Sequence, residues 1–227
     1  IVIIEHDNNN VKQSSFSTIT AANKISNEVE VLVLGNKIDK IVSELKKTSD
    51  VSMINFVDFD FLANQIAEDL SKVIASFLGK NNFTHILLPS STFGKNLGPK
   101  IATMLDVQQI SDVINIIDHE TFERPIYAGN AIAKVKSKDK VKVITARPTC
   151  FEPCGQEGNV PIQKLDITLD KDKSVDFVKY DQSASDRPEL TSAKIIISGG
   201  RGVQNGENFK LLEGIADKLG AAMGASR

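Results

Sequence analysis

Short apolar runs alternate with segments whose apolar residues recur every three or four positions, and this alternation constrains the fold more than any other feature. The apolar runs are residues 1–4, 29–34, 53–57 and 84–88. The segments with helical spacing are residues 16–25, 38–45 and 62–78, and a further helix is expected to start near Gly98. Alternating strands and helices form a mostly parallel sheet with helices on both faces. We therefore predict an α/β fold that begins with a three-layer parallel-sheet amino-terminal domain.

After about Asp112 strand-like runs follow one another with turn residues and no long helix between them. These runs are residues 113–117, 122–127, 131–136 and 141–145. We predict that they form a β-rich extension of the same domain, and residues 166–181 favour one more strand. Residues 183–188 have the composition of a linker. The predicted organisation is an amino-terminal α/β domain at 1–182, a linker at 183–190 and a second domain at 191–227.

The last predicted elements open this second domain. An apolar run at 195–197 leads into Ser198-Gly199-Gly200-Arg201-Gly202, and helical spacing follows at 207–219. A buried strand that runs into glycines and then a helix is typical of the start of a nucleotide-binding α/β unit, because the backbone can approach a phosphate closely. A tight corner without a ligand is the alternative, since one glycine-rich turn is weak evidence. We predict the first part of a second doubly wound nucleotide-binding domain and expect the 227 residues to be a partial chain.

The composition argues against several classes of function. Lys and Arg number 27 against 29 Asp and Glu, so no basic excess is available to bind a nucleic-acid backbone. No apolar run approaches the roughly 20 residues that a membrane span requires. Two cysteines in this length argue for a reducing compartment and against a disulfide framework. Because the sequence begins at Ile1, we expect its start to have been cut or processed.

Residue types that usually carry catalysis are sparse. The three histidines are scattered without metal-ligand spacing, so no metal site is predicted, and His85 is expected to be a hydrogen-bonded structural residue within a strand. Cys150 and Cys154 are interpreted as two ordinary thiols in a loop spanning 151–161. Without a nucleophile and base in view, a hydrolase is poorly supported. Residues 90–96 could hold phosphate or could simply be a capped helix start, and the sequence leaves both open.

The most specific features are short motifs spread along almost the whole chain. The earlier motifs are Phe93-Gly94-Lys95-Asn96, Gln109-Ile110-Ser111-Asp112 and Arg124-Pro125-Ile126-Tyr127-Ala128-Gly129-Asn130-Ala131. The second half contains Asp186-Arg187-Pro188-Glu189-Leu190, Ser198-Gly199-Gly200-Arg201-Gly202, Gly206-Glu207-Asn208-Phe209 and Gly224-Ala225-Ser226-Arg227. In this order and combination, the motifs resemble those of the α subunit of electron transfer flavoprotein.

The resemblance implies an electron carrier rather than an enzyme with a substrate of its own. It implies an αβ heterodimer that accepts electrons from acyl-CoA and related dehydrogenases of fatty acid β-oxidation and passes them singly to a membrane-bound quinone oxidoreductase. In that family FAD lies mainly in the second domain of the α subunit, against the β subunit, which carries AMP. The implied location is the mitochondrial matrix, with a bacterial cytoplasm as the alternative.

The same resemblance implies site residues. Arg201 matches the FAD-contacting arginine of the Gly-Gly-Arg-Gly loop, and Ser226 and Arg227 match a Ser-Arg pair that reaches the flavin. A guanidinium beside the flavin ring stabilises negative charge that arrives with an electron, and we expect Arg227 to have this role. Because a complete FAD domain needs roughly a hundred further residues, the site is expected to be incomplete within this sequence. The alternatives are a truncated nucleotide-binding or docking module without redox activity and a paralogue that serves a specialised dehydrogenase or a bifurcating system.

Overall fold

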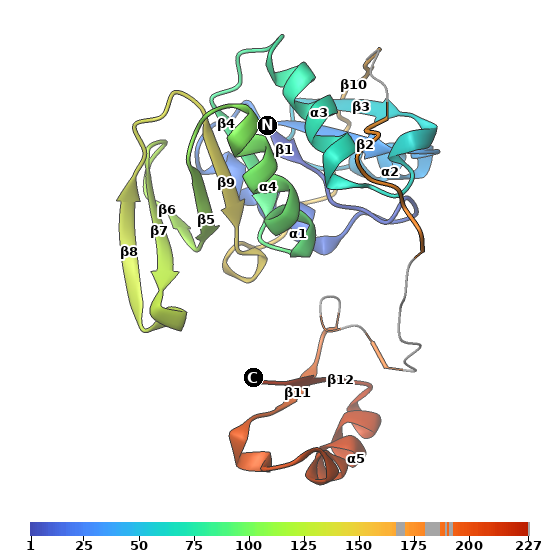
Figure 1. Cartoon of the computed structure of the whole chain (residues 1–227), viewed down its shortest axis with the longest axis vertical. Helices are drawn as coiled ribbons and strands as arrows, with labels where there is room; N and C mark the ends of the chain where they lie inside the picture. The colour runs from blue at the N-terminus through green and yellow to red at the C-terminus, as the bar shows by residue number, and fades with distance from the viewer. Residues whose placement is uncertain (167–170, 180–186, 189, 191–192, 227) are drawn as a thin grey trace. The chain divides into compact units, whose positions relative to one another are not determined.

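The chain forms two compact units, Ile1–Phe177 and Val178–Arg227 (Figure 1). The computed structural model describes residues 1–166, 171–179, 187–188, 190 and 193–226. Unit 1 contains most of the secondary structure, and unit 2 contains the last strands and the last helix.

Unit 1 is built on a seven-stranded sheet in which all neighbouring strands are parallel. Its order is β10 (Ile162–Lys164), β3 (Met53–Asp58), β2 (Glu30–Gly35), β1 (Val2–Ile3), β4 (His85–Pro89), β9 (Lys142–Ala146) and β5 (Gln109–Val113). Every residue of β4 and β9 is buried, as expected for strands covered on both faces. The predicted parallel sheet is confirmed.

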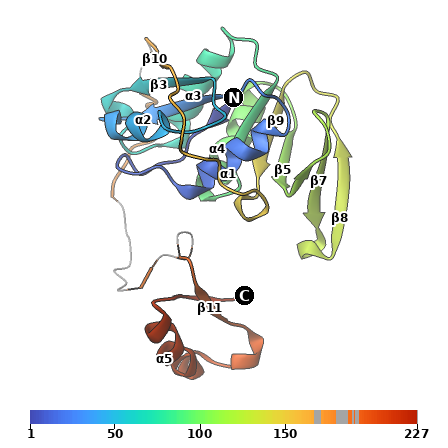
Figure 2. The same cartoon turned by 180° about the vertical axis from the view of Figure 1, so that it is seen from behind.

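Helices cover both faces of this sheet (Figure 2). On one face lie α1 (Gln13–Asn23) and α2 (Asp39–Leu45), and on the other lie α3 (Ala67–Leu78) and α4 (Thr92–Met104). Alternate residues of β2 pack on opposite faces of the sheet, because successive side chains of a strand point to opposite faces. Val31 packs in the core under α1 and α2, and Leu32 packs in the core under α3 and α4. The predicted three layers are confirmed.

In the part of the chain that is described, no helix is both long enough and apolar enough to cross a membrane.

The β-rich extension is a separate antiparallel sheet of β6 (Asn115–Ile116), β7 (Thr121–Ile126) and β8 (Ala131–Lys136). Phe122 anchors it in the core of unit 1 with a fully buried ring. The prediction was wrong for residues 141–145, because that segment forms β9 between β4 and β5 of the parallel sheet. Lys142 and Thr145 interrupt its apolar residues, so the segment lacks the continuous apolar run of a strand covered on both faces, although every residue of β9 is buried. Residues 113–117 likewise divide between β5 and β6.

Two helices begin at positions that differ from the prediction. The segment predicted as one helix at 62–78 consists of a short 3-10 helix, η1 (Asp60–Leu62), and α3, separated by Gln65 at a left-handed φ of 50°. The helix expected near Gly98 begins at Thr92, because the Ser91 hydroxyl caps it by accepting a hydrogen bond from the Gly94 amide at 3.3 Å.

The segment that leaves the parallel sheet also differs from the prediction. Of the residues expected to form a strand at 166–181, those at 167–170 and 180–181 lie outside the described residues, and 171–179 contain no strand. The additional strand is β10 instead, which pairs with β3. Asp172 holds the following segment against α3: its carboxylate forms an ion pair with Lys72 at 2.7 Å, and its backbone amide donates a hydrogen bond to Asp69 Oδ1 at 2.6 Å. The predicted loop at 151–161 is confirmed.

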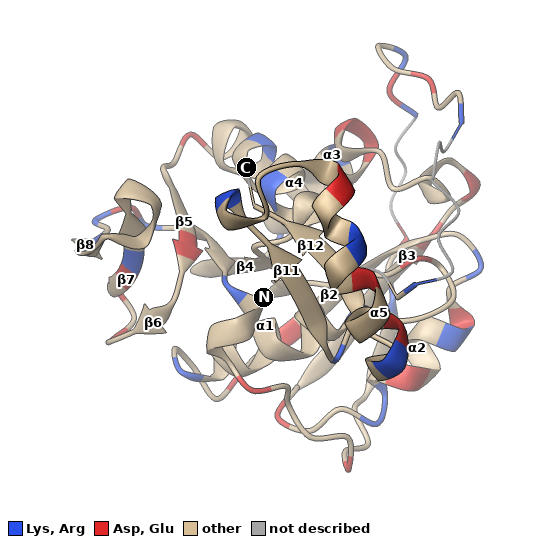
Figure 3. Cartoon of the chain, turned by 90° about the horizontal axis from the view of Figure 1, so that it is seen from below, with Lys and Arg blue, Asp and Glu red and all other residues tan. Residues whose placement is uncertain are grey.

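Unit 2 is a strand–helix–strand segment with parallel strands, which confirms the predicted start of a second α/β domain. Its elements are β11 (Ile196–Gly199), the 3-10 turns η4 (Arg201–Val203) and η5 (Gly206–Phe209), α5 (Lys210–Leu219) and β12 (Ala222–Ala225). Acidic and basic residues are interspersed along α5 (Figure 3). Gly220 ends this helix in a left-handed conformation, at φ 58°, that suits glycine.

Candidate functional site

The two parallel strands of unit 2 bring distant parts of its sequence together at one edge. Gly199 pairs with Ala225 in the register of β11 and β12, and the Ser226 amide donates to the Gly199 carbonyl at 3.0 Å. The carboxyl ends of both strands therefore lie side by side. This edge is where ligands of open parallel sheets bind. Arg201 and Ser226 follow these strand ends, whereas Arg227 lies outside the described residues.

Glycines keep this edge narrow and its backbone accessible. A Cβ atom on Gly200 would lie 3.0 Å from the Ser226 Oγ, so the loop after β11 passes directly beside the residue after β12. A Cβ atom on Gly199 would lie 2.8 Å from the Phe209 ring, which packs beneath the loop. Over Gly202, in contrast, no atom of the described residues other than its chain neighbours lies within 4 Å of such a Cβ. A ligand can therefore approach the loop backbone from the open side.

The groups on this edge suit part of an anionic dinucleotide. Arg201 is exposed, and within the described part of the chain no ion pair involves its guanidinium. A guanidinium has a planar, permanently charged fork that pairs well with phosphate oxygens, and the neighbouring Ser226 hydroxyl can donate a hydrogen bond. Together with the open glycine backbone, this donor set fits a phosphate-bearing group such as that of FAD.

A second polar cluster lies in unit 1, where β4, β5 and β9 end. Asp112 accepts hydrogen bonds from Arg147 Nε at 3.1 Å and from Ser90 Oγ at 2.9 Å, and Arg147 Nη2 pairs with its other carboxylate oxygen. The Arg147 guanidinium holds the pKa of Asp112 below its ordinary value. Ser90 thus bonds within the protein and Ser91 caps α4. This geometry favours the capped helix start over a phosphate loop at 90–96.

The remaining candidates from the sequence have structural surroundings. The His85 ring pairs through Nε2 with the His119 carbonyl at 2.7 Å, and its Nδ1 lies 2.9 Å from the Thr84 hydroxyl, which confirms a hydrogen-bonded histidine. Cys150 and Cys154 are free thiols. Burial raises the pKa of Cys154 to about 11, so this residue is not a thiolate at neutral pH.

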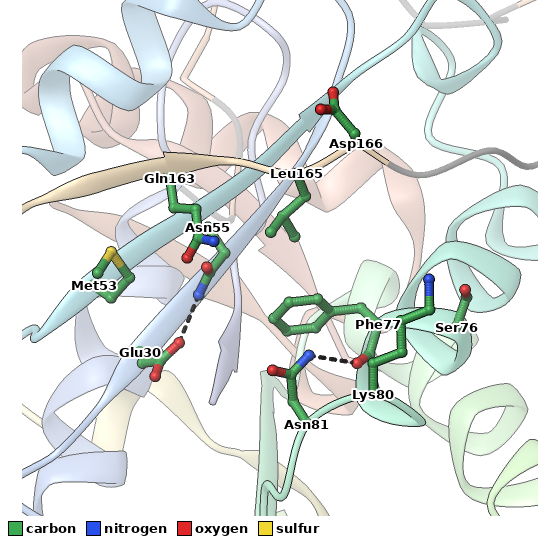
Figure 4. Close-up of a pocket in the computed structure, with 10 residues that line it drawn as sticks. All are labelled: Glu30, Met53, Asn55, Ser76, Phe77, Lys80, Asn81, Gln163, Leu165 and Asp166. Carbon is green, nitrogen blue, oxygen red and sulfur yellow. Dashed lines mark hydrogen bonds between the residues drawn. The ribbon is translucent and has the colours of Figure 1, made fainter.

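Unit 1 contains a cavity of about 290 Å³, whose lining residues are drawn in Figure 4. Glu30 and Met53, the first residues of β2 and β3, line it together with the end of α3 and with Leu165 and Asp166, so the cavity lies at the amino ends of β2 and β3 and beside the segment after β10. The buried Asn55 side chain within it donates to Glu30 at 2.6 Å. Asn55 and Glu30 are thus bonded to each other, and Glu30 and Met53 lie at the edge opposite to that where parallel sheets bind ligands. We assign no ligand to it.

Sequence reasoning missed residues that shape both strand edges. Arg147 was not singled out because its partner Asp112 is 35 positions away. In unit 2, Asn205 was missed, and Asn208 was named only within a motif, with no role assigned to it. The signal for Asn205 was its place before a helical segment, where asparagine is a frequent capping residue.

A parallel α/β protein whose last unit opens with a strand, a glycine loop, a helix and a parallel strand has the architecture of a nucleotide-binding protein. Comparison with protein families is more specific. The profile of the electron transfer flavoprotein domain matches residues 1–170, and that of the electron transfer flavoprotein FAD-binding domain matches residues 189–227.

Curated relatives agree over the whole chain. The electron transfer flavoprotein subunit alpha of Pseudomonas aeruginosa is 45% identical, and this chain covers 73% of its length. The mitochondrial protein of the same name from Dictyostelium discoideum is 44% identical, with 68% covered, and that of Bradyrhizobium diazoefficiens is 42% identical, with 72% covered. The chain belongs to the family of electron transfer flavoprotein α subunits, and the resemblance seen in its motifs is confirmed.

Proposed function

We propose that this chain works as the α subunit of an FAD-dependent electron carrier. In this proposal it pairs with a β subunit that holds AMP, accepts electrons from acyl-CoA and related dehydrogenases, and delivers them to a quinone oxidoreductase. The names of its relatives include mitochondrial and bacterial proteins, which supports a mitochondrial matrix or a bacterial cytoplasm as its location. The domain limits 1–182, 183–190 and 191–227 belong to the same proposal.

The observation that carries the proposal is the edge formed by β11 and β12. It places the Arg201 loop beside Ser226, two segments that the family resemblance independently associates with FAD, through the Ser226–Gly199 bond of 3.0 Å. FAD, when bound, supplies the one-electron redox chemistry. Arg201 and Ser226 would hold its polar groups, and the open face at Gly202 lets the cofactor approach the backbone. Arg227 is assigned to the same site from its place in the sequence alone.

The visible absorption spectrum of the α subunit, produced at the full length that its gene encodes and co-purified with its β partner, tests this function. We expect a flavin spectrum that bleaches with dithionite. A colourless complex would contradict the proposal and would favour a docking module without redox activity.

Replacing Arg201 with glutamine is expected to weaken FAD binding by at least about tenfold, because one charge-assisted contact to the cofactor is lost. Titration of FAD into the cofactor-free αβ complex, followed by flavin fluorescence, measures the change. Lys218→Gln is the matched control, since it also removes one positive charge but lies in the last turn of α5, before the amino end of β12. Equal affinities for the two variants would show that Arg201 does not contact FAD.

A further inference from the structure

The glycine loop of unit 2 ends in a strained turn. Gln204 has φ 68° and ψ −56°, and the Asn205 amide donates to the Val203 carbonyl at 2.8 Å across it. This is a γ-turn with positive φ, an uncommon conformation that side-chain-bearing residues adopt only when their surroundings hold them there. The turn comes directly after Arg201, Gly202 and Val203, the residues of η4.

Two asparagines at this turn use opposite ends of their side-chain amides, and only Asn208 bonds to the turn itself. Asn208 Nδ2 donates to the Val203 carbonyl at 2.8 Å, so this carbonyl accepts from both the turn and the side chain. Asn205 Oδ1 accepts from the Asn208 backbone amide at 3.1 Å, which is an ordinary helix cap for η5. Asn208 therefore acts as a donor, and Asn205 acts as an acceptor.

Val203 links this turn to the strand end. Its side chain would lie 2.9 Å from a Cβ on Gly199, and the Phe209 ring would lie 2.8 Å from the same atom. The side chain of Val203 is thus fixed against the end of β11, while Asn208 fixes its carbonyl. Because η4 spans three residues, holding Val203 also sets the direction in which the backbone presents Arg201.

We propose that Asn208 is a positioning residue for the Arg201 loop: its side-chain amide holds the Val203 carbonyl and so keeps Arg201 aligned with the anionic part of FAD. This inference rests on the proposed FAD site. It assigns Asn208 no contact with the cofactor. Asn208 keeps the loop ordered before FAD binds. Because FAD binding then does not have to order the loop, the affinity for FAD is higher.

The two asparagines allow a matched pair of variants. Asn208→Asp keeps the shape of the side chain, but a carboxylate cannot donate to the Val203 carbonyl. Asn205→Asp introduces the same negative charge three residues away and keeps the acceptor that caps η5. We expect Asn208→Asp to weaken FAD binding to the full-length αβ complex about tenfold and to alter the visible circular dichroism of the bound flavin. We expect Asn205→Asp to change the affinity by less than about twofold and to leave the dichroism unchanged.

Two further measurements separate positioning from other effects. If Asn208 acts through Arg201, then adding Asn208→Asp to Arg201→Gln should weaken FAD binding by much less than tenfold. In the cofactor-free complex, hydrogen–deuterium exchange of residues 199–206 should be faster in Asn208→Asp than in Asn205→Asp, at unchanged thermal unfolding temperatures. Equal effects of the two variants, or additive losses with Arg201→Gln, would overturn the inference. If Asn208→Asp does not change the hydrogen–deuterium exchange, the inference about Asn208 is wrong, whether or not the wild-type complex binds FAD. If the wild-type complex binds no FAD, that result alone refutes only the proposed function.

Discussion

Replacing Gly94 with alanine should destabilise unit 1 by about 3 kcal/mol, because the new methyl group has no space. A Cβ at this position would lie 1.9 Å from the Pro89 carbonyl oxygen and 3.2 Å from the Leu88 Cβ. Both belong to β4, an interior strand of the parallel sheet that cannot give way. The first turn of α4 would have to lift away from the core that Leu97 helps to form. Urea unfolding followed by circular dichroism measures the loss of free energy of unfolding.

Gly79→Ala is the control for this prediction. Gly79 caps α3 at φ −64°, which alanine adopts readily, and its added Cβ would meet the Ala75 carbonyl at an ordinary 3.4 Å. Alanine also reduces the conformational freedom of the unfolded chain. We therefore expect the free energy of unfolding to equal that of the wild-type protein or to exceed it by up to about 0.5 kcal/mol. Similar losses in both variants would show that α4 does not require close approach of its backbone to β4.

The parallel sheet could be predicted because its interior strands carry continuous apolar runs that no exposed segment tolerates. The strand order could not be predicted, because the sequence does not show that β9 joins the parallel sheet after β6, β7 and β8 have formed a separate one. The error at residues 141–145 has this origin. The predicted helix starts were wrong where a single residue decides them. The Ser91 cap starts α4 six residues before the expected Gly98, and the left-handed backbone of Gln65 separates η1 from α3.

The candidate site was predictable to the extent that it rests on glycines and on motif resemblance. The apolar run before Gly199 indicated the strand and its ligand-binding end, and the structure then brought Ser226 to that end through the register of β11 with β12. The frame of the loop was not predictable. The strain at Gln204 and the donor role of Asn208 depend on backbone dihedral angles and on a carbonyl five residues earlier, neither of which leaves a periodic pattern in sequence.

His6 shows a similar dependence on tertiary structure. Its ring is buried at the end of β1, with Nε2 3.0 Å from the Leu34 carbonyl and Nδ1 accepting from the Asn8 amide at 3.1 Å. This arrangement fits a neutral ring whose proton is on Nε2. Burial lowers the pKa of His6 to about 4, although the Leu34 carbonyl and the charge of Asp7 favour protonation.

The low pKa of His6 predicts an acid-sensitive fold. Well above pH 6.5 the ring is neutral in both states. As the pH falls through this value, the unfolded chain takes up a proton that the folded protein resists until about pH 4. Wild-type protein should therefore lose about 2 kcal/mol of free energy of unfolding between pH 7 and pH 5 through this residue. His6→Gln keeps a donor for the Leu34 carbonyl but does not titrate. Between pH 7 and pH 5, the free energy of unfolding of this variant should therefore fall by about 2 kcal/mol less than that of the wild-type protein. Urea unfolding at each pH gives both curves, and parallel curves would mean that His6 is protonated equally easily in the folded and unfolded chains.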